Sequence, residues 1–146
     1  MSDISLKLTR IIRAGRNRVF EAWTTSEMIT QWWRPGENIC TEAFVDLRIG
    51  GEIRIANAGV DGRTVWITGK FEKIEHPTLL IYSWLMGTSI QNPTRVTVQF
   101  NEHPDGTELV LTHERFASQE MCDQHLKGWT GCLDGLTAFL KSGSSA

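Results

Sequence analysis

The chain has 146 residues, of which 40% are hydrophobic and 22% are charged, and its formal net charge at pH 7 is -2. This composition argues against a disordered chain, and the small net charge argues against a partner such as nucleic acid that a strongly charged surface would attract. A chain of this length buries roughly 68% of the surface of its unfolded form. It can therefore fold around one core without a metal or disulfides.

The sequence shows neither a membrane span nor a signal peptide, and both observations concern the location of the protein in the cell. No apolar run approaches the ~20 residues of a membrane span, and the N-terminus lacks the charged-then-apolar pattern of a signal peptide. Cys40, Cys122 and Cys132 are too few and too irregularly spaced for a secreted disulfide framework. We expect free thiols and a cytoplasmic protein.

The first predicted elements are one strand and two short helices. Residues 4–9 alternate apolar and polar side chains, which is typical of a half-buried strand, and Ala14-Gly15 ends it. A short helix follows, with Val19, Phe20 and Trp23 at helical spacing. Thr24-x-x-Glu27 fits a capping box and Arg34-Pro35-Gly36 is a stop signal, which together predict a second helix over 27–33.

Turn signals then separate runs rich in β-branched and aromatic residues. These signals are Gly50-Gly51, Asp61-Gly62, His76-Pro77-Thr78, Asn92-Pro93 and Pro104-Asp105-Gly106. The strands they predict lie near 40–47, 52–58, 63–75, 79–87, 94–101 and 107–116. With the first strand they form a seven-stranded antiparallel sheet.

The last long segment, 119–141, is predicted to form one helix. Its apolar stripe consists of Leu126, Trp129, Leu133, Leu136 and Leu140. A second face carries Gly128, Gly131 and Gly135, each of which costs a helix ~1 kcal/mol relative to alanine. Glycines at these positions indicate a close approach, either by a ligand or second subunit or by the protein's own strand or loop.

These elements predict an α+β fold in which a curved sheet wraps around a long C-terminal helix. The helix covers only a stripe about 10 Å wide, so the sheet must curve and leave a cavity where it diverges from the helix. Gly69 would assist the bending or mark a bulge. We expect one domain over 1–141 and a disordered tail over 142–146.

Several local motifs appear in a recognisable order between Leu6 and Leu140. They are Val19-Phe20-Glu21-Ala22-Trp23-Thr24, Trp32-Trp33-x-Pro35, Asp46-Leu47-Arg48-Ile49-Gly50-Gly51, Gly69-Lys70-Phe71, Leu80-Ile81-Tyr82-Ser83-Trp84, Gly106-Thr107-Glu108-Leu109 and His125-x-x-Gly128-Trp129. Their order and spacing resemble the family of the activator of heat-shock-protein-90 ATPase, in the START and Bet v allergen-like (SRPBCC) superfamily. Arg34 departs from the small residue common in the family and would place a positive charge near the cavity mouth.

The resemblance implies the helix-grip fold and a ligand cavity. Superfamily relatives bind lipids, polyketides, hormones or other hydrophobic molecules, and a few catalyse cyclisation or ring opening. Chaperone activation belongs to proteins in which such a domain follows a separate N-terminal domain, for which we expect no room in this chain. Fold alone does not determine the activity.

Seven residues are predicted to bind the ligand. They are Trp33, Trp66, Tyr82, Trp84, Met86, His113 and Trp129. The tryptophans combine a large apolar surface with one N–H donor, although core packing is the simpler role for each of them. Trp23 and Trp32 are expected to anchor the short helices.

Catalysis would need a titratable group inside the cavity, for which His113, Tyr82 and His125 are the available residues. A lone histidine is more often a hydrogen-bonded core residue. Cys122-x-x-His125 has a spacing that zinc accepts, but two more ligands would have to come from distant residues. We therefore expect no metal and no cofactor.

Three functions remain open. We expect binding of a small hydrophobic or aromatic molecule rather than catalysis; the alternative is a cyclase-like or hydrolase-like enzyme acting on a polyketide-like or aromatic substrate. A weaker alternative is a chaperone-associated module that binds a protein partner. A homodimer is compatible with the sequence.

Overall fold

The computed structural model describes residues 4–87 and 93–142. Its strands are β1 (Ser5–Ile12), β2 (Ile39–Val45), β3 (Glu52–Ala58), β4 (Thr64–Glu75), β5 (Leu79–Met86), β6 (Thr94–His103) and β7 (Gly106–Glu114). Its helices are α1 (Arg16–Thr24), α2 (Ser26–Trp32) and α3 (Gln119–Ser142). This order confirms the predicted α+β fold class. The predicted break at Asn92 and, apart from position 142, the predicted tail lie outside the described residues.

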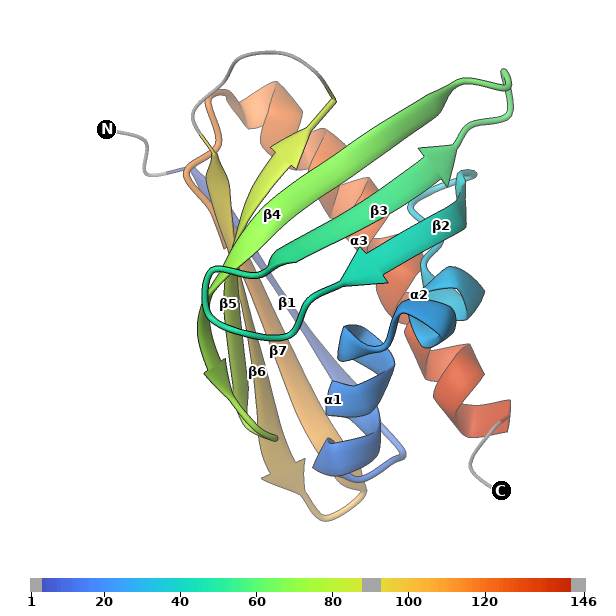
Figure 1. Cartoon of the computed structure of the whole chain (residues 1–146). Coiled ribbons are helices and arrows are strands. Elements are labelled where there is room, and N and C mark those ends of the chain that lie inside the picture. Colours follow the sequence, from blue (N-terminus) through green and yellow to red (C-terminus); the bar gives the residue numbers. More distant parts are fainter. Residues whose placement is uncertain (1–3, 88–92, 143–146) are drawn as a thin grey trace.

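The seven strands form one sheet in the order β1-β7-β6-β5-β4-β3-β2, and all neighbours are antiparallel. The last six strands therefore form a meander, and β1 adds to its end. Figure 1 shows the sheet curling around α3, which runs along the inner side; α2 lies beside β2, and both α1 and α2 lie beside the lower part of α3. The core fills the space between the helices and the sheet.

The close backbone packing at Gly69 explains why this position holds a glycine. A Cβ at this position would overlap the backbone carbonyl oxygen of Ser83 on the neighbouring strand. The register of β4 against β5 shifts by one residue between Phe71 and Lys73. The bulge expected at Gly69 thus lies a few residues further along β4, whereas Gly69 itself permits the close approach of another backbone, as a glycine in a strand can.

The start of α2 differs from the prediction. The helix begins at Ser26, and no side chain caps its first turn, so the predicted capping box is wrong. Thr24 instead belongs to the end of α1, where its Oγ1 donates to the carbonyl oxygen of Phe20 at 2.9 Å. Ser26 Oγ accepts the backbone N–H of Val45 at 3.1 Å, so this end of α2 is bonded to β2.

The buried stripe of α3 also differs from the predicted one at its beginning. Leu126 is 38% exposed, whereas Cys122 and His125 are buried in its place. The remaining stripe is buried as predicted and consists of Trp129, Leu133, Leu136 and Leu140. Hydropathy alone favours leucine over histidine, but a histidine whose two nitrogens both find partners can occupy the inward position.

The glycine face of α3 packs against the protein itself. A Cβ on Gly135 would overlap the carbonyl oxygen of Trp32, at the end of α2. One on Gly131 would overlap the carbonyl oxygen of Arg34 in the following loop. Of the two alternatives for this face, the structure therefore supports close approach by the protein's own loop.

Replacing Gly135 with alanine is expected to destabilise the protein by about 1–3 kcal/mol, because the new methyl group meets backbone that cannot move aside. Gly128→Ala is the matched control, since its Cβ would meet the Pro35 side chain at an ordinary 3.4 Å. The control should be neutral or slightly stabilising through helix propensity. Urea denaturation of both variants checks this, and equal effects would contradict the packing argument.

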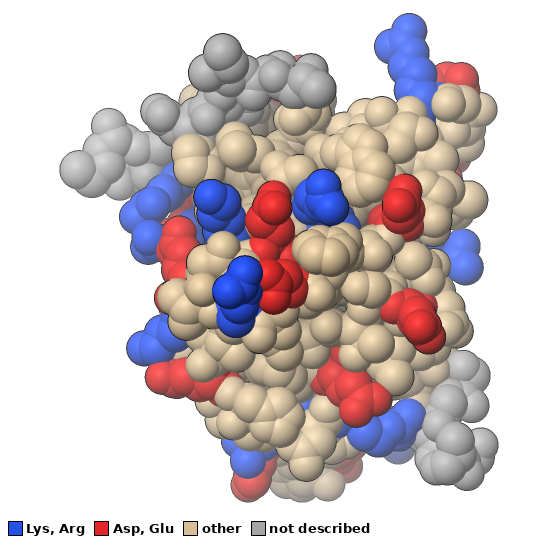
Figure 2. Space-filling view, viewed as in Figure 1, with Lys and Arg blue, Asp and Glu red and all other residues tan. Residues whose placement is uncertain are grey.

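The basic residues near the N-terminus lie mostly at the surface. Arg16 pairs with Glu102 at 2.8 Å, and Arg10 lies 3.6 Å from Asp134 of α3. Figure 2 shows charges of both signs spread over the visible face of the sheet rather than gathered into one patch. Such exposed pairs contribute little to stability.

Candidate functional site

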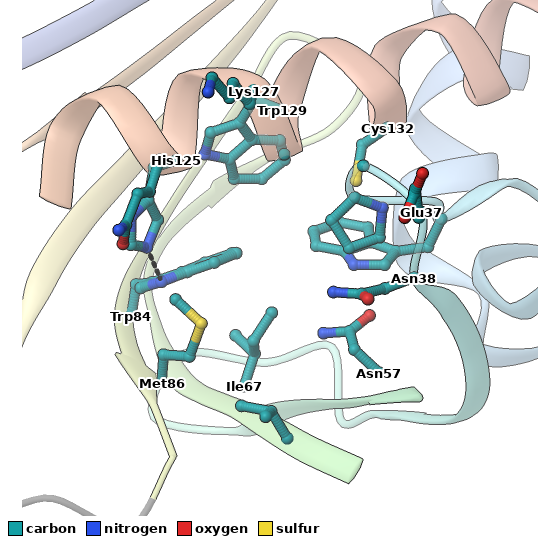
Figure 3. A pocket seen from close by; sticks show the side chains of 16 residues that line it. Glu37, Asn38, Asn57, Ile67, Trp84, Met86, His125, Lys127, Trp129 and Cys132 are labelled. Atoms are coloured by element: carbon teal, nitrogen blue, oxygen red, sulfur yellow. Dashed lines mark hydrogen bonds between the residues drawn. The ribbon is translucent and has the colours of Figure 1, made fainter. Parts of the chain in front are cut away.

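A cavity of about 360 Å³ lies between α3, the strands β3, β4 and β5, and the loop that follows α2. Its lining consists of Trp33, Pro35, Gly36, Glu37, Asn38, Asn57, Val65, Ile67, Trp84, Met86, Gln124, His125, Lys127, Gly128, Trp129 and Cys132. Figure 3 shows the residues of α3 on one side and those of the strands on the other, with Asn38 and Asn57 at one end. The cavity therefore forms where the sheet and helix diverge.

Three indole rings form the apolar wall. Trp33 lies 5.2 Å from Trp129 and 6.1 Å from Trp84, and Trp84 lies 5.1 Å from Trp129, measured between ring centroids. All three are buried. Behind them, Trp23 stacks on Trp129 at 5.9 Å with an interplanar angle of 21°. Such aromatic pairs add to the stabilisation from area burial, so the wall is held rigidly.

The mouth of the cavity carries the exposed lining residues. Glu37 and Lys127 supply opposite charges there, while Gln124 and Met86 are also exposed. Arg34 is exposed between the lining residues Trp33 and Pro35 but does not itself line the cavity, so the cation among the lining residues is Lys127.

His125 holds Trp84 in place. The Trp84 indole N–H donates to His125 Nε2 at 3.2 Å, which is the dashed line in Figure 3. On the other side of the ring, His125 Nδ1 lies 2.9 Å from the backbone carbonyl oxygen of Met121. A carbonyl oxygen can only accept, so Nδ1 carries the proton and Nε2 the lone pair. Both nitrogens are engaged and the ring is neutral.

His113 holds Trp129 in a similar way. The Trp129 indole N–H donates to His113 Nδ1 at 3.0 Å, so the proton of the neutral ring is on Nε2. That nitrogen lies 2.7 Å from Thr94 Oγ1, and the Thr94 hydroxyl donates to the carbonyl oxygen of Trp84 at 3.2 Å. This chain of hydrogen bonds connects α3 with β5, β6 and β7.

Burial determines the protonation of this cluster. It lowers the pKa of His113 to about 2, assisted by the nearby His125, and burial also lowers the pKa of His125. Burial raises the pKa of the Tyr82 hydroxyl and of the Cys132 thiol. Near neutral pH all four groups are uncharged.

Two buried polar atoms of the cavity lining have no hydrogen-bond partner among the described residues. They are Trp33 Nε1, a donor, and Asn57 Oδ1, an acceptor. Trp33 is 1% and Asn57 4% exposed. Leaving a buried polar atom unpaired costs about 1–3 kcal/mol, and neither of these atoms has surface of its own accessible to a water-sized probe.

The structure brings together some of the predicted site residues. Trp33, Trp84, Met86 and Trp129 line the cavity, as does His125. Tyr82 and His113 are buried and do not line it. Tyr82 lies behind the wall, where its hydroxyl oxygen accepts the Trp23 indole N–H at 3.2 Å.

Trp66, one of the residues predicted to bind the ligand, does not line the cavity. Its neighbours Val65 and Ile67 line the cavity, and alternation along β4 turns Trp66 to the outer face, where it is 39% exposed. Sequence reasoning also missed Asn57. The alternation along β3 could have identified it: Ile53, Ile55 and Asn57 all fall on the inward face, and Asn57 is the polar residue among them.

Other kinds of site find little support in the described part of the chain. Within residues 4–87 and 93–142, no three His, Cys, Asp or Glu side chains are arranged to hold a metal ion. The same residues include no helix long and apolar enough to cross a membrane. Cys40, Cys122 and Cys132 are all free and buried.

A family model described as activator of Hsp90 ATPase homolog 1-like protein matches residues 13–141. The chain belongs to this family. Its fold is of the helix-grip type, as the resemblance implied. No curated protein matches the sequence.

Several solved structures are similar to nearly the whole chain. The AHSA1-like protein of Aeromonas hydrophila is 26% identical with a TM-score of 0.80, covering 97% of this chain and 94% of its own. A protein of Rhizobium leguminosarum is 28% identical with a TM-score of 0.79, covering 95% of each. The AHSA1 protein of Silicibacter pomeroyi, at 21% identity and a TM-score of 0.84 over 96% of this chain and 99% of its own, shares the fold. These names specify no ligand, so function must be argued from the cavity.

Proposed function

We propose that this protein binds a small hydrophobic or aromatic molecule in the cavity between α3 and the sheet. The observation that carries the proposal is the wall of three buried indoles around a space of about 360 Å³. Ligand sites in proteins range over about 300–1,000 Å³ and combine apolar lining with a few polar groups. The family's fold is compatible with such a role.

The wall is suited to binding because its side chains are already ordered. Trp84 and Trp129 are each held by a histidine, and Trp129 is stacked on Trp23. A ligand entering such a site does not have to immobilise these side chains, which lowers the entropy cost of association. Apolar surface buried against the indoles would supply most of the affinity.

The enzymatic alternative has less support. Tyr82 and His113 do not line the cavity, and His125 uses one ring nitrogen to donate to Met121 and the other to accept from Trp84. A general acid or base needs a nitrogen free to exchange a proton with the substrate. The chaperone-associated module, the homodimer and the cytoplasmic location stay predictions.

Filling the cavity tests the proposal. Ile67→Phe replaces a branched alkyl side chain at the cavity with a larger aromatic ring, whereas Trp66→Phe changes the adjacent residue on the outer face of β4. In a panel of two-ring aromatic compounds, we expect saturable binding to the wild type with Kd in the tens of micromolar or below. Ile67→Phe should weaken it at least tenfold and Trp66→Phe should not change it, as measured by isothermal titration calorimetry.

A second measurement and a folding check accompany the calorimetry. Tryptophan fluorescence gives an independent readout, because Trp33, Trp84 and Trp129 line the cavity. Absence of binding to the wild type across the panel, or equal binding by Ile67→Phe, would contradict a ligand site at this place. Thermal unfolding of both variants confirms that each is folded.

A further inference from the structure

A second, smaller cavity adjoins the main one, and we call it the annex. It has a volume of about 140 Å³ and lies between the first turns of α3, the end of β5 and the start of β6. The residues that line both cavities are Trp84, Met86, Gln124 and His125. Figure 3 shows Trp84, Met86 and His125 together at the end of the main cavity opposite Asn57. These shared residues form the boundary between the two cavities.

The boundary has a fixed part and an adaptable part. Trp84 is 6% and His125 9% exposed, and the Trp84 indole N–H donates to His125 Nε2 at 3.2 Å. Met86, by contrast, is 40% exposed, and Gln124 is also exposed. A methionine side chain has three rotatable bonds, and exposed side chains change rotamer within nanoseconds. A ligand in the main cavity can therefore extend past Met86 and Gln124 into the annex while the bond between Trp84 and His125 stays intact.

The annex is suited to an apolar group. Besides the boundary residues, its lining consists of Leu85, Thr94 and Met121. The Thr94 hydroxyl already has partners, since it donates to the carbonyl oxygen of Trp84 and lies 2.7 Å from His113 Nε2. None of the described lining residues is charged near neutral pH, because burial lowers the pKa of His125. Apolar cavities of about 150 Å³ can hold a benzene-sized group, so a short hydrocarbon chain fits the annex.

We propose that the ligand has two parts, an aromatic ring system that lies against the indoles of the main cavity and an aliphatic tail of about four to six carbons that lies in the annex. This inference rests on the proposed function and specifies the ligand class for that site. Trp84 and His125 fix the position of the ring. The space beyond Met86 sets the length of the tail that the protein accepts.

A series of 2-alkylnaphthalenes tests the inference. We expect the wild type to bind 2-butylnaphthalene roughly tenfold or more tightly than 2-methylnaphthalene, because each methylene buried in an apolar cavity strengthens binding by about three- to fourfold. The gain should end before 2-octylnaphthalene, whose tail is longer than the annex can hold. Calorimetric titration of the protein into each compound gives the dissociation constants.

Met121→Trp fills the annex and leaves the main cavity unchanged, since Met121 lines only the annex. This variant should keep the wild-type affinity for 2-methylnaphthalene and lose most of the preference for 2-butylnaphthalene. Leu126→Trp is the matched control on the same helix, because Leu126 is 38% exposed, lines neither cavity and should leave the preference unchanged. Met86→Phe is a second test, in which a rigid ring replaces the adaptable side chain at the boundary and should also lower the preference.

Each failure has a separate meaning. If none of the naphthalenes binds the wild type, the proposed function itself is contradicted. If 2-butylnaphthalene binds no more tightly than 2-methylnaphthalene, or if Met121→Trp keeps the wild-type preference, the main cavity binds ligands but the two-part ligand is wrong. Binding of 2-methylnaphthalene shows that Met121→Trp is folded with its main cavity intact. Without such binding the result for Met86→Phe decides, and an unchanged preference there would overturn the inference.

Discussion

Replacing Trp129 with alanine is expected to lower the free energy of unfolding by about 4 kcal/mol or more, since truncating a buried tryptophan costs about 3–5 kcal/mol. Trp129 stacks on Trp23, packs against Trp33 and Trp84, and donates its N–H to His113. The substitution also leaves His113 Nδ1 without its donor, which adds to the cost. Because whole proteins are stable by only about 5–15 kcal/mol, the midpoint of thermal unfolding should fall by about 10 °C or more.

Two control variants separate the causes. Trp129→Phe keeps much of the ring packing and removes the N–H, so its cost should lie between those of the wild type and Trp129→Ala. Trp66→Ala removes the same side chain from the outer face, where it is 39% exposed, and should cost about 1 kcal/mol or less. Equal losses for Trp66→Ala and Trp129→Ala in chemical denaturation would contradict the central role of Trp129.

Acid is expected to destabilise the protein through its two buried histidines. The pKa of His113 is lowered to about 2 in the folded state, against about 6.5 when unfolded, and the pKa of His125 is also lowered. Below pH 6.5 the unfolded chain therefore binds protons that the folded protein does not. The stabilisation is complete well above pH 6.5 and is lost progressively as the pH falls from there toward the folded-state pKa.

The size of this effect follows from proton linkage. Well below pH 6.5, one such histidine contributes a slope of about 1.4 kcal/mol per pH unit, so His113 alone should remove roughly 2.3 kcal/mol between pH 6.5 and 4.5. His125 adds to the slope as long as the pH stays above its own folded-state pKa. Urea denaturation at a series of pH values measures both contributions.

The variant His113→Asn isolates the contribution of His113. The asparagine amide oxygen can still accept the Trp129 N–H but does not titrate, so the slope below pH 6.5 should decrease by about 1.4 kcal/mol per unit. His125→Asn should act in the same direction. An unchanged slope in the double variant would show that the acid sensitivity comes from other groups.

The order of elements could be predicted because it depends on local patterns. Turn signals such as Gly50-Gly51 and Asp61-Gly62 stand between runs of alternating residues, and the predicted strand over 52–58 coincides with β3. The start of α2 could not be predicted, because Thr24 bonds within α1 although its spacing from Glu27 fits a capping box. The Thr24 hydroxyl could either cap α2 or bond back to the backbone of α1, and the structure shows the bond within α1.

The cavity was predicted from geometry, but its lining was predicted only in part. Trp84, Met86 and Trp129 line it as expected, whereas Trp66 does not. The choice of face on β4 is a matter of register, and a shift by one residue moves every side chain to the other side. The central strands are rich in apolar residues on both faces, so the sequence did not show which set points inward.

By itself, the sequence determined the fold class, the order of the strands along the chain and the position of the long helix, because these depend on periodicity and turns within one segment. Only the tertiary structure showed that the glycines of α3 pack against the end of α2 and the loop that follows it. It also showed that His113 and His125 bond the tryptophans of the cavity wall, and that Trp33 and Asn57 each have a buried polar atom without a partner among the described residues. These features arise between segments far apart in the chain. Hydrogen-bond partners and close contacts depend on the distances between such segments, which local patterns do not contain.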